Sequence, residues 1–243
     1  MFNDFNKYNS MISVCMATYN GEKYIKDQLL SILKQIGLND EIIISDDLSK
    51  DKTIEVIESI KDSRIKLFFN KNRGYTNNFQ NAIQHASGDY IFLSDQDDIW
   101  MDNKLKIMSE LLIKYDFVVS DAKLVNINLE SLGATYFELR GGGANGFINN
   151  LKKLKYIGCC MAFRKIILKK VLPFPINSKL CPHDMWITMI AEFYFKTYVI
   201  KEPLLLYRRH GENVSTHISS TPLLFKIQFR IYSFFKVISR FSF

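Results

Sequence analysis

Short apolar runs alternate with segments of helical periodicity through the first half of the chain. The strand-like runs are ISVCMA, EIIIS, IKLFF, YIFLS and FVVSD, and helices are expected over residues 22–35, 51–60, 76–86 and 104–114. Strands that alternate with helices indicate a parallel sheet with helices on both faces. The pattern therefore predicts an α/β fold built on a mostly parallel sheet with flanking helices.

A polar cluster follows each of the first four strands. In chain order the clusters are TYNGE, DDLSKD, NKNRG and SDQDD. Ligands of open α/β sheets bind outside the carboxyl ends of the strands. We therefore expect the four clusters to converge on one crevice, which is the candidate site.

The second half of the chain is less regular. Periodicity fades over residues 125–150, which end in RGGGANG. We expect a mobile loop there, because a phosphate-binding loop needs a strand before it and a helix with Lys-Ser/Thr after it. Strand signal returns in IGCCMAF, TYVI and LLLYRRH, with a helix starting near Asp184. These features predict one domain over residues 1–220, followed by a tail over 221–243.

Composition narrows the class of protein. With 243 residues and 47% hydrophobic content the chain can bury a substantial core. The four cysteines have the spacing of neither a disulfide framework nor a CxxC zinc pair, which favours a reducing compartment. The start MFNDFNKYNS lacks a signal-peptide pattern, and no run of about 20 apolar residues occurs. We expect a cytoplasmic protein.

The segment YIFLSDQDDIW brings Asp95, Asp97 and Asp98 to the end of one strand. Several neighbouring carboxylates repel one another unless a cation or proton offsets them, and Mg²⁺ and Mn²⁺ prefer such ligands. The alternative is an acidic turn that caps the next helix. A calcium-binding EF-hand loop is excluded, since Trp100 and Lys106 stand where its glycine and glutamate belong. An aspartyl phosphatase is disfavoured because ATYNG follows the first strand.

The runs SVCMATYNGEKYIKDQLLSILKQ, EIIISDDLSKDKT, NRGYTNNFQNAI and GDYIFLSDQDDIW, in this order, resemble family 2 glycosyltransferases of the GT-A fold. The resemblance covers residues 12–121. Weaker likenesses follow in PHDMW and in LLLYRRHGENVS, the latter similar to rhamnosyltransferase-like bacterial members. The resemblance implies a hexosyltransferase that uses a nucleotide sugar and favours the metal interpretation of the Asp-x-Asp pair.

The resemblance also implies roles for individual residues in donor binding. Asp47 would accept the ring N–H of a pyrimidine, because a carboxylate only accepts hydrogen bonds. For Asp46 and Asp47 the alternative is a turn and helix cap, and for Arg73 a solvated loop arginine. The full set expected around the donor is Ala17, Thr18, Tyr19, Glu22, Asp46, Asp47, Arg73, Asp95 and Gln96.

For metal binding and catalysis the resemblance points to the later clusters. Asp95, Asp97 and His210 would hold Mg²⁺ or Mn²⁺, which offsets the charge on the departing diphosphate. For His210 the alternatives are contact with the diphosphate and a structural role. Asp184 matches the family base that takes the proton of the acceptor hydroxyl, although a helix N-cap is the alternative for it. His183 departs from the Glu-Asp pair that is more common in the family, which leaves the role of this position open.

Four other side chains are candidates for contact with substrate. Arg208 and Arg209 offer charge to phosphate oxygens. Trp100 and Trp186 are candidates for stacking on a sugar ring, with core packing expected for at least one of them.

These inferences predict a metal-dependent, inverting transfer from a UDP- or dTDP-sugar to a saccharide or lipid-linked saccharide, in the synthesis of cell-surface polysaccharide. No nucleic-acid partner is expected. A catalytically silent relative that binds nucleotide or saccharide is the main alternative. A Rossmann-type oxidoreductase is a weaker one, because no GxGxxG opens a helix.

The tail carries much of the chain's formal charge of +7 and has no Asp or Glu after Glu212. Thr221 and Pro222 suit the start of a helix. At 100° per residue its basic side chains share about a third of the circumference, opposite a broad apolar face. This pattern is typical of a helix in an anionic membrane interface, and docking on the protein itself or on a partner subunit is the alternative. We expect peripheral contact with the inner leaflet through residues 221–243.

Overall fold

The computed structural model describes residues 10–143, 145–211 and 222–242. Its strands are β1 (Ile12–Thr18), β2 (Glu41–Asp46), β3 (Ile65–Phe69), β4 (Tyr90–Ser94), β5 (Ile99–Trp100), β6 (Phe117–Val125), β7 (Ser131–Thr135), β8 (Met161–Arg164) and β9 (Thr197–Arg208). Its helices are α1 (Ile25–Leu33), α2 (Thr53–Ser59), α3 (Tyr75–His85), α4 (Lys104–Leu112), α5 (Tyr136–Arg140), α6 (Phe147–Lys152), α7 (Leu168–Val171), α8 (His183–Tyr194) and α9 (Leu223–Ile238).

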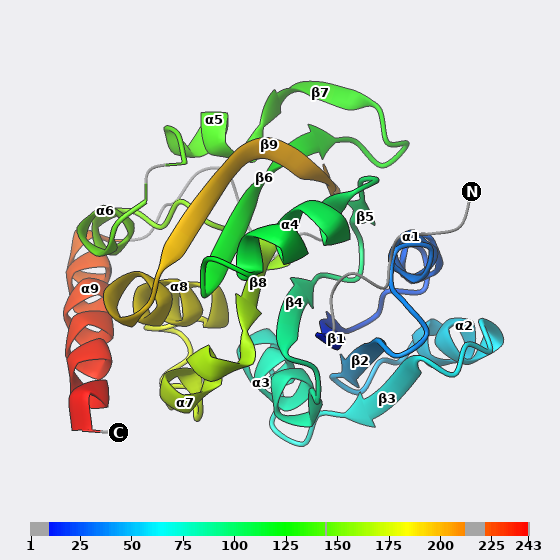
Figure 1. The fold of residues 1–243 in the computed structure, drawn as a ribbon, viewed down its shortest axis with the longest axis horizontal. Coiled ribbons are helices and arrows are strands. Elements are labelled where there is room, and N and C mark those ends of the chain that lie inside the picture. Colours follow the sequence, from blue (N-terminus) through cyan, green and yellow to red (C-terminus); the bar gives the residue numbers. More distant parts are fainter. Residues whose placement is uncertain (1–9, 144, 212–221, 243) are drawn as a thin grey trace.

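Across the described residues all nine strands join one sheet of order β3-β2-β1-β4-β8-β6-β9-β5, with β7 paired to β6. Strands β1 to β4 run parallel to one another, as do β6 and β9. Strand β8 runs antiparallel between β4 and β6, and the short β5 pairs antiparallel with the end of β9. The carboxyl ends of β1 to β4 therefore meet at one edge of the sheet (Figure 1).

The helices pack where their apolar residues recur every three or four positions. In α1, Ile25, Leu29 and Ile32 are fully buried, and in α3 Phe79 and Ile83 take the same role. Helix α3 covers β1 and β2, whereas α4 packs on β6 and β8. The predicted helices and strands of the first half are confirmed, with ends that differ by a few residues.

Strand β9 differs from its prediction. TYVI and LLLYRRH were expected to be separate strands, but both belong to β9, which continues through Pro203. Residue Ser120 of β6 pairs with Ile200, and the next residue, Asp121, pairs with Pro203. This bulge leaves Lys201 and Glu202 without partners in the β6 ladder, so one strand accommodates the proline.

The loop expected over residues 125–150 is also wrong in part, because it contains β7, α5 and α6. The start of α5 is a capping box. The backbone N–H of Glu138 donates to Thr135 Oγ1 at 3.3 Å, and the Glu138 side chain accepts from the Thr135 N–H at 2.7 Å. Gly141, with a φ of 83°, ends the helix in the left-handed conformation.

Helix α9 confirms the predicted amphipathic helix, and it packs against α6 and α8 at the end of the molecule opposite α1 and α2 (Figure 1). Thr221, expected to cap it, lies outside the described residues. No described helix combines the length and the hydropathy needed to cross a bilayer.

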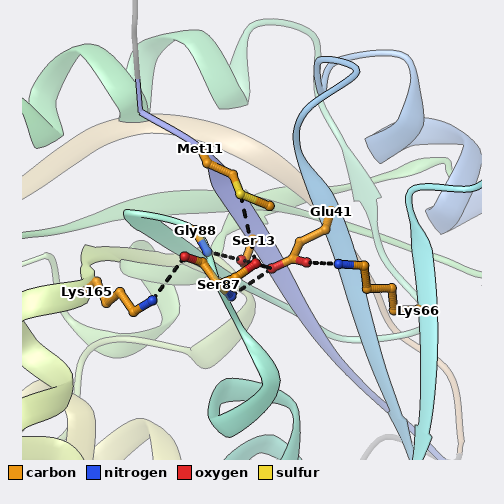
Figure 2. A network of polar contacts seen from close by, with 7 residues as sticks. All are labelled: Met11, Ser13, Glu41, Lys66, Ser87, Gly88 and Lys165. Carbon is orange, nitrogen blue, oxygen red and sulfur yellow. Dashed lines mark hydrogen bonds and ion pairs between the residues drawn. The ribbon is translucent and has the colours of Figure 1, made fainter.

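A buried carboxylate ties the amino-terminal ends of the central strands together (Figure 2). Glu41, 1% exposed, accepts hydrogen bonds from Ser13 Oγ at 2.5 Å, Ser87 Oγ at 2.7 Å and the Ser87 N–H at 2.8 Å. Its second oxygen lies 2.6 Å from Lys66 Nζ. Burial alone would raise the pKa of Glu41, but the bonds from Lys66, Ser13 and Ser87 outweigh it and lower the pKa to about 2.

The Glu41 network predicts a pH-dependent contribution to stability. Its folded pKa lies below the unfolded value, so the stabilisation is complete above about pH 4.5 and is lost as pH falls toward 2. We expect Glu41→Gln to lower the free energy of unfolding by about 2 kcal/mol at pH 7, and the difference from wild type to narrow below pH 4.5. Urea unfolding across this pH range measures it. Exposed Glu58→Gln is the control, and an equal deficit at pH 7 and pH 3 would contradict the assignment.

Candidate active site

The polar loops after β1, β2, β3 and β4 lie side by side. The Gln96 amide exchanges two hydrogen bonds with the backbone of Tyr19, at 2.9 and 3.0 Å. Asp47 accepts from Asn70 Nδ2 at 2.8 Å and from the Gly74 N–H at 2.9 Å. The predicted convergence of the four clusters is therefore confirmed.

The donor-binding candidates fall into two groups by exposure. Buried Asp46 accepts hydrogen bonds from Thr18 Oγ1 at 2.8 Å and from Ser49 Oγ at 2.6 Å. These bonds stabilise the turn after β2 on its buried side. Half-buried Asp47 lies next to them and reaches the loop after β3.

The second group lies nearer solvent. Tyr19 is 47% exposed, Arg73 is exposed and Ala17 is half-buried. The Glu22 carboxylate accepts from the Lys52 N–H at 2.8 Å and so joins the loop after β1 to the start of α2. These residues form the more accessible part of the converging loops.

The acid cluster after β4 is held by the end of β9. His210 Nε2 lies 2.7 Å from Asp97 Oδ2, and the ring stacks on Tyr24 at 4.9 Å. Arg208 donates through Nε to the Asp97 carbonyl at 2.9 Å and through its backbone N–H to Asp98 at 3.1 Å. Arg208 is 4% exposed, so it stabilises the acid cluster from its buried side. This role differs from the phosphate contact predicted for Arg208.

The charges of Asp97 and Asp184 both act on Asp95, so these three carboxylates form one electrostatic group. Burial raises the pKa of Asp95 to about 7, with further contributions from the charges of Asp97 and Asp184. Asp184 is the second residue of α8, and its Oδ1 accepts the N–H of Met185 at 2.7 Å. The charge of Asp184 also acts on Tyr75 and Tyr136, whose pKa values are raised mainly by burial.

The acid cluster fits a divalent cation. Asp95, Asp98 and Cys159 each offer a ligand atom within 4.8 Å of the others, and buried Asp98 Oδ2 has no hydrogen-bond partner among the described residues. Burial, Asp97 and Asp95 raise the pKa of Asp98 well above its usual value. Carboxylate oxygens suit Mg²⁺ or Mn²⁺, whereas the Cys159 thiol is not a ligand that these ions prefer.

Lys104 is a site residue that the sequence pattern did not reveal. Its side chain is fully buried, with Nζ 2.7 Å from the Cys159 carbonyl and 4.9 Å from the Trp100 ring centre. Burial lowers the pKa of Lys104, while the charges of Asp98 and Asp95 are among those that oppose this effect. A lysine in the first turn of a helix is ordinarily solvated, so only the tertiary fold identifies it as a counter-charge to the acid cluster.

His183, whose role the sequence leaves open, lies in a buried aromatic environment. Its ring is buried and stacks on Phe79 at 4.1 Å, and burial lowers its pKa. A Cβ at Gly158 would lie 2.7 Å from His183 Nε2, so this glycine makes room for the ring. His183 therefore packs against Phe79 and fixes the start of α8, next to Asp184, through this contact.

The two tryptophans belong to the core of the protein. Trp100 and Trp186 are both fully buried, and Trp186 Nε1 donates to the Val171 carbonyl at 2.7 Å. Sugar stacking is therefore wrong for both, and core packing applies to each. The four cysteines are buried and unpaired, in line with the absence of a disulfide framework.

Comparisons with known proteins bear on the family. The family model described as Glycosyl transferase family 2 matches residues 13–172. The dTDP-rhamnosyl transferase RfbG of Shigella flexneri is 31% identical over 228 residues, which cover 84% of this chain and 75% of the relative.

Solved structures share the fold. S. aureus TarS 1-349 in complex with UDP has a TM-score of 0.64 at 22% identity, over 82% of this chain and 60% of the TarS 1-349 chain. The mannosyltransferase PcManGT from Pyrobaculum calidifontis, in complex with GDP-Man and Mn²⁺, has a TM-score of 0.60 at 16% identity, over 97% of this chain and 75% of PcManGT. The predicted GT-A fold is thus confirmed, and the chain belongs to glycosyltransferase family 2.

Proposed function

We propose that the protein is a metal-dependent, inverting glycosyltransferase that moves a sugar from a UDP- or dTDP-sugar to a saccharide or lipid-linked saccharide in cell-surface polysaccharide synthesis. The observation that carries this proposal is the grouping of Asp95, Asp97 and Asp184 near the carboxyl ends of β1 to β4, where burial, with further contributions from the charges of Asp97 and Asp184, raises the pKa of Asp95 to about 7. Perturbed carboxylates at such a position are typical of a catalytic site.

The nucleotide would lie over the loops after β1, β2 and β3. Asp47 would accept the ring N–H of uracil or thymine while keeping its bonds to Asn70 and Gly74, since a carboxylate has about four acceptor positions. The names of the relatives support a pyrimidine donor: RfbG is a dTDP-rhamnosyl transferase, and TarS was solved with UDP.

Asp95, Asp97 and His210 would hold Mg²⁺ or Mn²⁺. Asp98, which offers a ligand atom within 4.8 Å of that of Asp95, would be a further candidate ligand. The bound ion supplies a Lewis acid that offsets negative charge on the departing diphosphate. Mn²⁺ accompanies GDP-Man in the PcManGT complex, which supports the same class of cofactor here. The chain itself orients Asp97, through His210 on its carboxylate and Arg208 on its carbonyl.

Asp184 would act as the general base. It would take the proton of the acceptor hydroxyl as that oxygen attacks the anomeric carbon and the nucleotide diphosphate leaves. Its position at the start of α8 suits this role, because the Met185 N–H orients one carboxylate oxygen. The acceptor would then approach from the side of α8, near Tyr75 and Tyr136.

The acceptor and the location of the enzyme complete the proposal. A cytoplasmic enzyme that meets a lipid-linked acceptor would contact the inner leaflet of the membrane through residues 221–243, of which α9 is the described part. A catalytically silent relative remains the second candidate, and variants at Asp97 and Asp184 distinguish the two.

We expect Mn²⁺ to be required for strong stabilisation by UDP or dTDP. Thermal unfolding with UDP, dTDP, GDP, CDP and NAD, each with and without Mn²⁺, measures this requirement. Saturation at a hundredfold excess over Kd stabilises by about 2.7 kcal/mol. Asp97→Asn should abolish the Mn²⁺-dependent part, while Asp102→Asn, an exposed acid five residues away, should not. Stabilisation by NAD alone would refute the proposal.

Asp184→Asn should remove catalysis and spare donor binding. The amide cannot take the acceptor proton at neutral pH, so we expect kcat for transfer to fall at least 100-fold. The stabilisation by nucleotide with Mn²⁺ should stay within about twofold of wild type in apparent Kd. Transfer assays with radiolabelled donor sugars measure the first effect. Unchanged activity would show that another group takes the proton, and an inactive wild type with intact nucleotide binding would favour the silent relative.

Lys104→Met tests the charge balance of the acid cluster. Without the buried Lys104 ammonium, Asp95 and Asp98 lose their internal counter-charge. We therefore expect the free energy of unfolding to fall by about 3 kcal/mol in the absence of metal. Mn²⁺ should restore more stability to this variant than to wild type. Chemical unfolding with and without Mn²⁺ measures both effects, and Lys106→Met, exposed on the same helix, is the control. A deficit that Mn²⁺ leaves unchanged would indicate a role in packing alone.

A further inference from the structure

Helix α9 turns its basic side toward the rest of the protein. Ser233 and Val237 are fully buried against it. Arg230 donates to the Lys152 carbonyl at 3.2 Å through Nε, and Arg240 donates to the Pro173 carbonyl and lies over the Trp186 ring. Arg230 and Arg240 of the predicted basic stripe therefore hold the helix against α6, α8 and the segment after α7, whereas Lys236 of the same stripe is exposed.

The opposite side of α9 is apolar and exposed. Leu224, Ile227, Ile231 and Phe235 follow one another at intervals of three or four residues, so they share one face, and 43–67% of each is exposed. Ile231 and Phe235 also line a shallow depression with Tyr232 and Lys236. Apolar side chains therefore lie on both sides of α9, because Phe229, Tyr232 and Val237 pack inward on the core while this second face stays exposed.

Two segments at this end of the molecule carry cations and no acids, whereas α8, which also packs on α9, contains Asp184 and Glu192. Residues 147–182, which contain α6 and α7, and residues 222–242 together hold twelve Lys and Arg and no Asp or Glu. The whole chain has a formal charge of +7, so the rest of the molecule is net negative. Exposed lysines of these elements include Lys152, Lys153, Lys169 and Lys179.

We propose that the exposed face of α9 docks on an anionic lipid bilayer. Leu224, Ile227, Ile231 and Phe235 enter the boundary between headgroups and acyl chains, and the lysines of residues 147–182 meet the lipid phosphates. A second copy of the chain fits this surface less well, because a symmetric pair would bring two sets of cations together. The inference rests on the membrane contact proposed above and adds the docking face of α9 and the participation of the lysines of residues 147–182.

Flotation of the whole protein with vesicles, without donor or metal, tests the docking face. We expect binding to phosphatidylglycerol vesicles and at least tenfold weaker binding to phosphatidylcholine vesicles. Ile231→Ser/Phe235→Ser should weaken binding to the anionic vesicles at least tenfold. Leu38→Ser, which removes an apolar residue 92% exposed elsewhere on the molecule, should bind like wild type.

A second set of variants separates charge from apolar contact. Lys152→Gln/Lys153→Gln/Lys169→Gln should weaken binding to anionic vesicles and flatten its dependence on salt. Lys61→Gln/Lys106→Gln/Lys114→Gln, of equal charge change and far from α9 in sequence, should not.

Three results would overturn the inference. They are no binding to anionic vesicles, equal binding by the Ile231→Ser/Phe235→Ser variant, and a concentration-dependent dimer in light scattering that the same variant abolishes. Nucleotide stabilisation with Mn²⁺ is measured on each variant in parallel. A failure of docking is thereby distinguished from a failure of the proposed transferase, which would remove nucleotide binding from the wild type as well.

Discussion

Repulsion among the carboxylates after β4 is the constraint on which the site depends. Asp95, Asp97 and Asp98 lie within four residues, and Asp184 approaches from α8, so burial would be unfavourable without compensation. Positive and hydrogen-bonding groups from two other segments, the end of β9 and the start of α4, compensate this repulsion in part. Arg208 comes from the end of β9, His210 follows it, and Lys104 comes from α4. The protein's own groups do not fully compensate the repulsion among the carboxylates, since Asp98 Oδ2 has no hydrogen-bond partner among the described residues.

The mixed sheet makes this compensation possible. Parallel β1 to β4 bring four loops to one edge, and β9 must lie two strands beyond β8 for its end to reach the same place. The bulge opposite Pro203 keeps β9 paired with β6 on both sides of the proline and with β5 at its end. Arg208 can then contact Asp97 and Asp98 across more than a hundred residues of sequence.

The limits of sequence reasoning follow from which contacts are local. Repeating β-α patterns gave the first half of the fold and the convergence of its loops, because local periodicity determines which faces are buried. The capping box of Thr135 and Glu138 is visible in the sequence and would have placed α5, yet the nearby glycines suggested a loop. The inward orientation of Arg208, Lys104 and both tryptophans depends on long-range packing, which periodicity does not encode. The inward contacts of Arg230 and Arg240 in α9 are likewise long-range.

The uneven division of charge makes the molecule an electric dipole. One end, formed by α6, α7 and α9, has a large excess of cations, while the remainder is net negative. At low ionic strength such a dipole rotates in the field of any polyanion before contact, and the effect fades beyond about 10 Å at 0.1 M salt. The protein will therefore adhere to cation exchangers and to nucleic acids through this one end. Such binding would be nonspecific, because it depends on the charge of the polyanion and not on specific contacts with it.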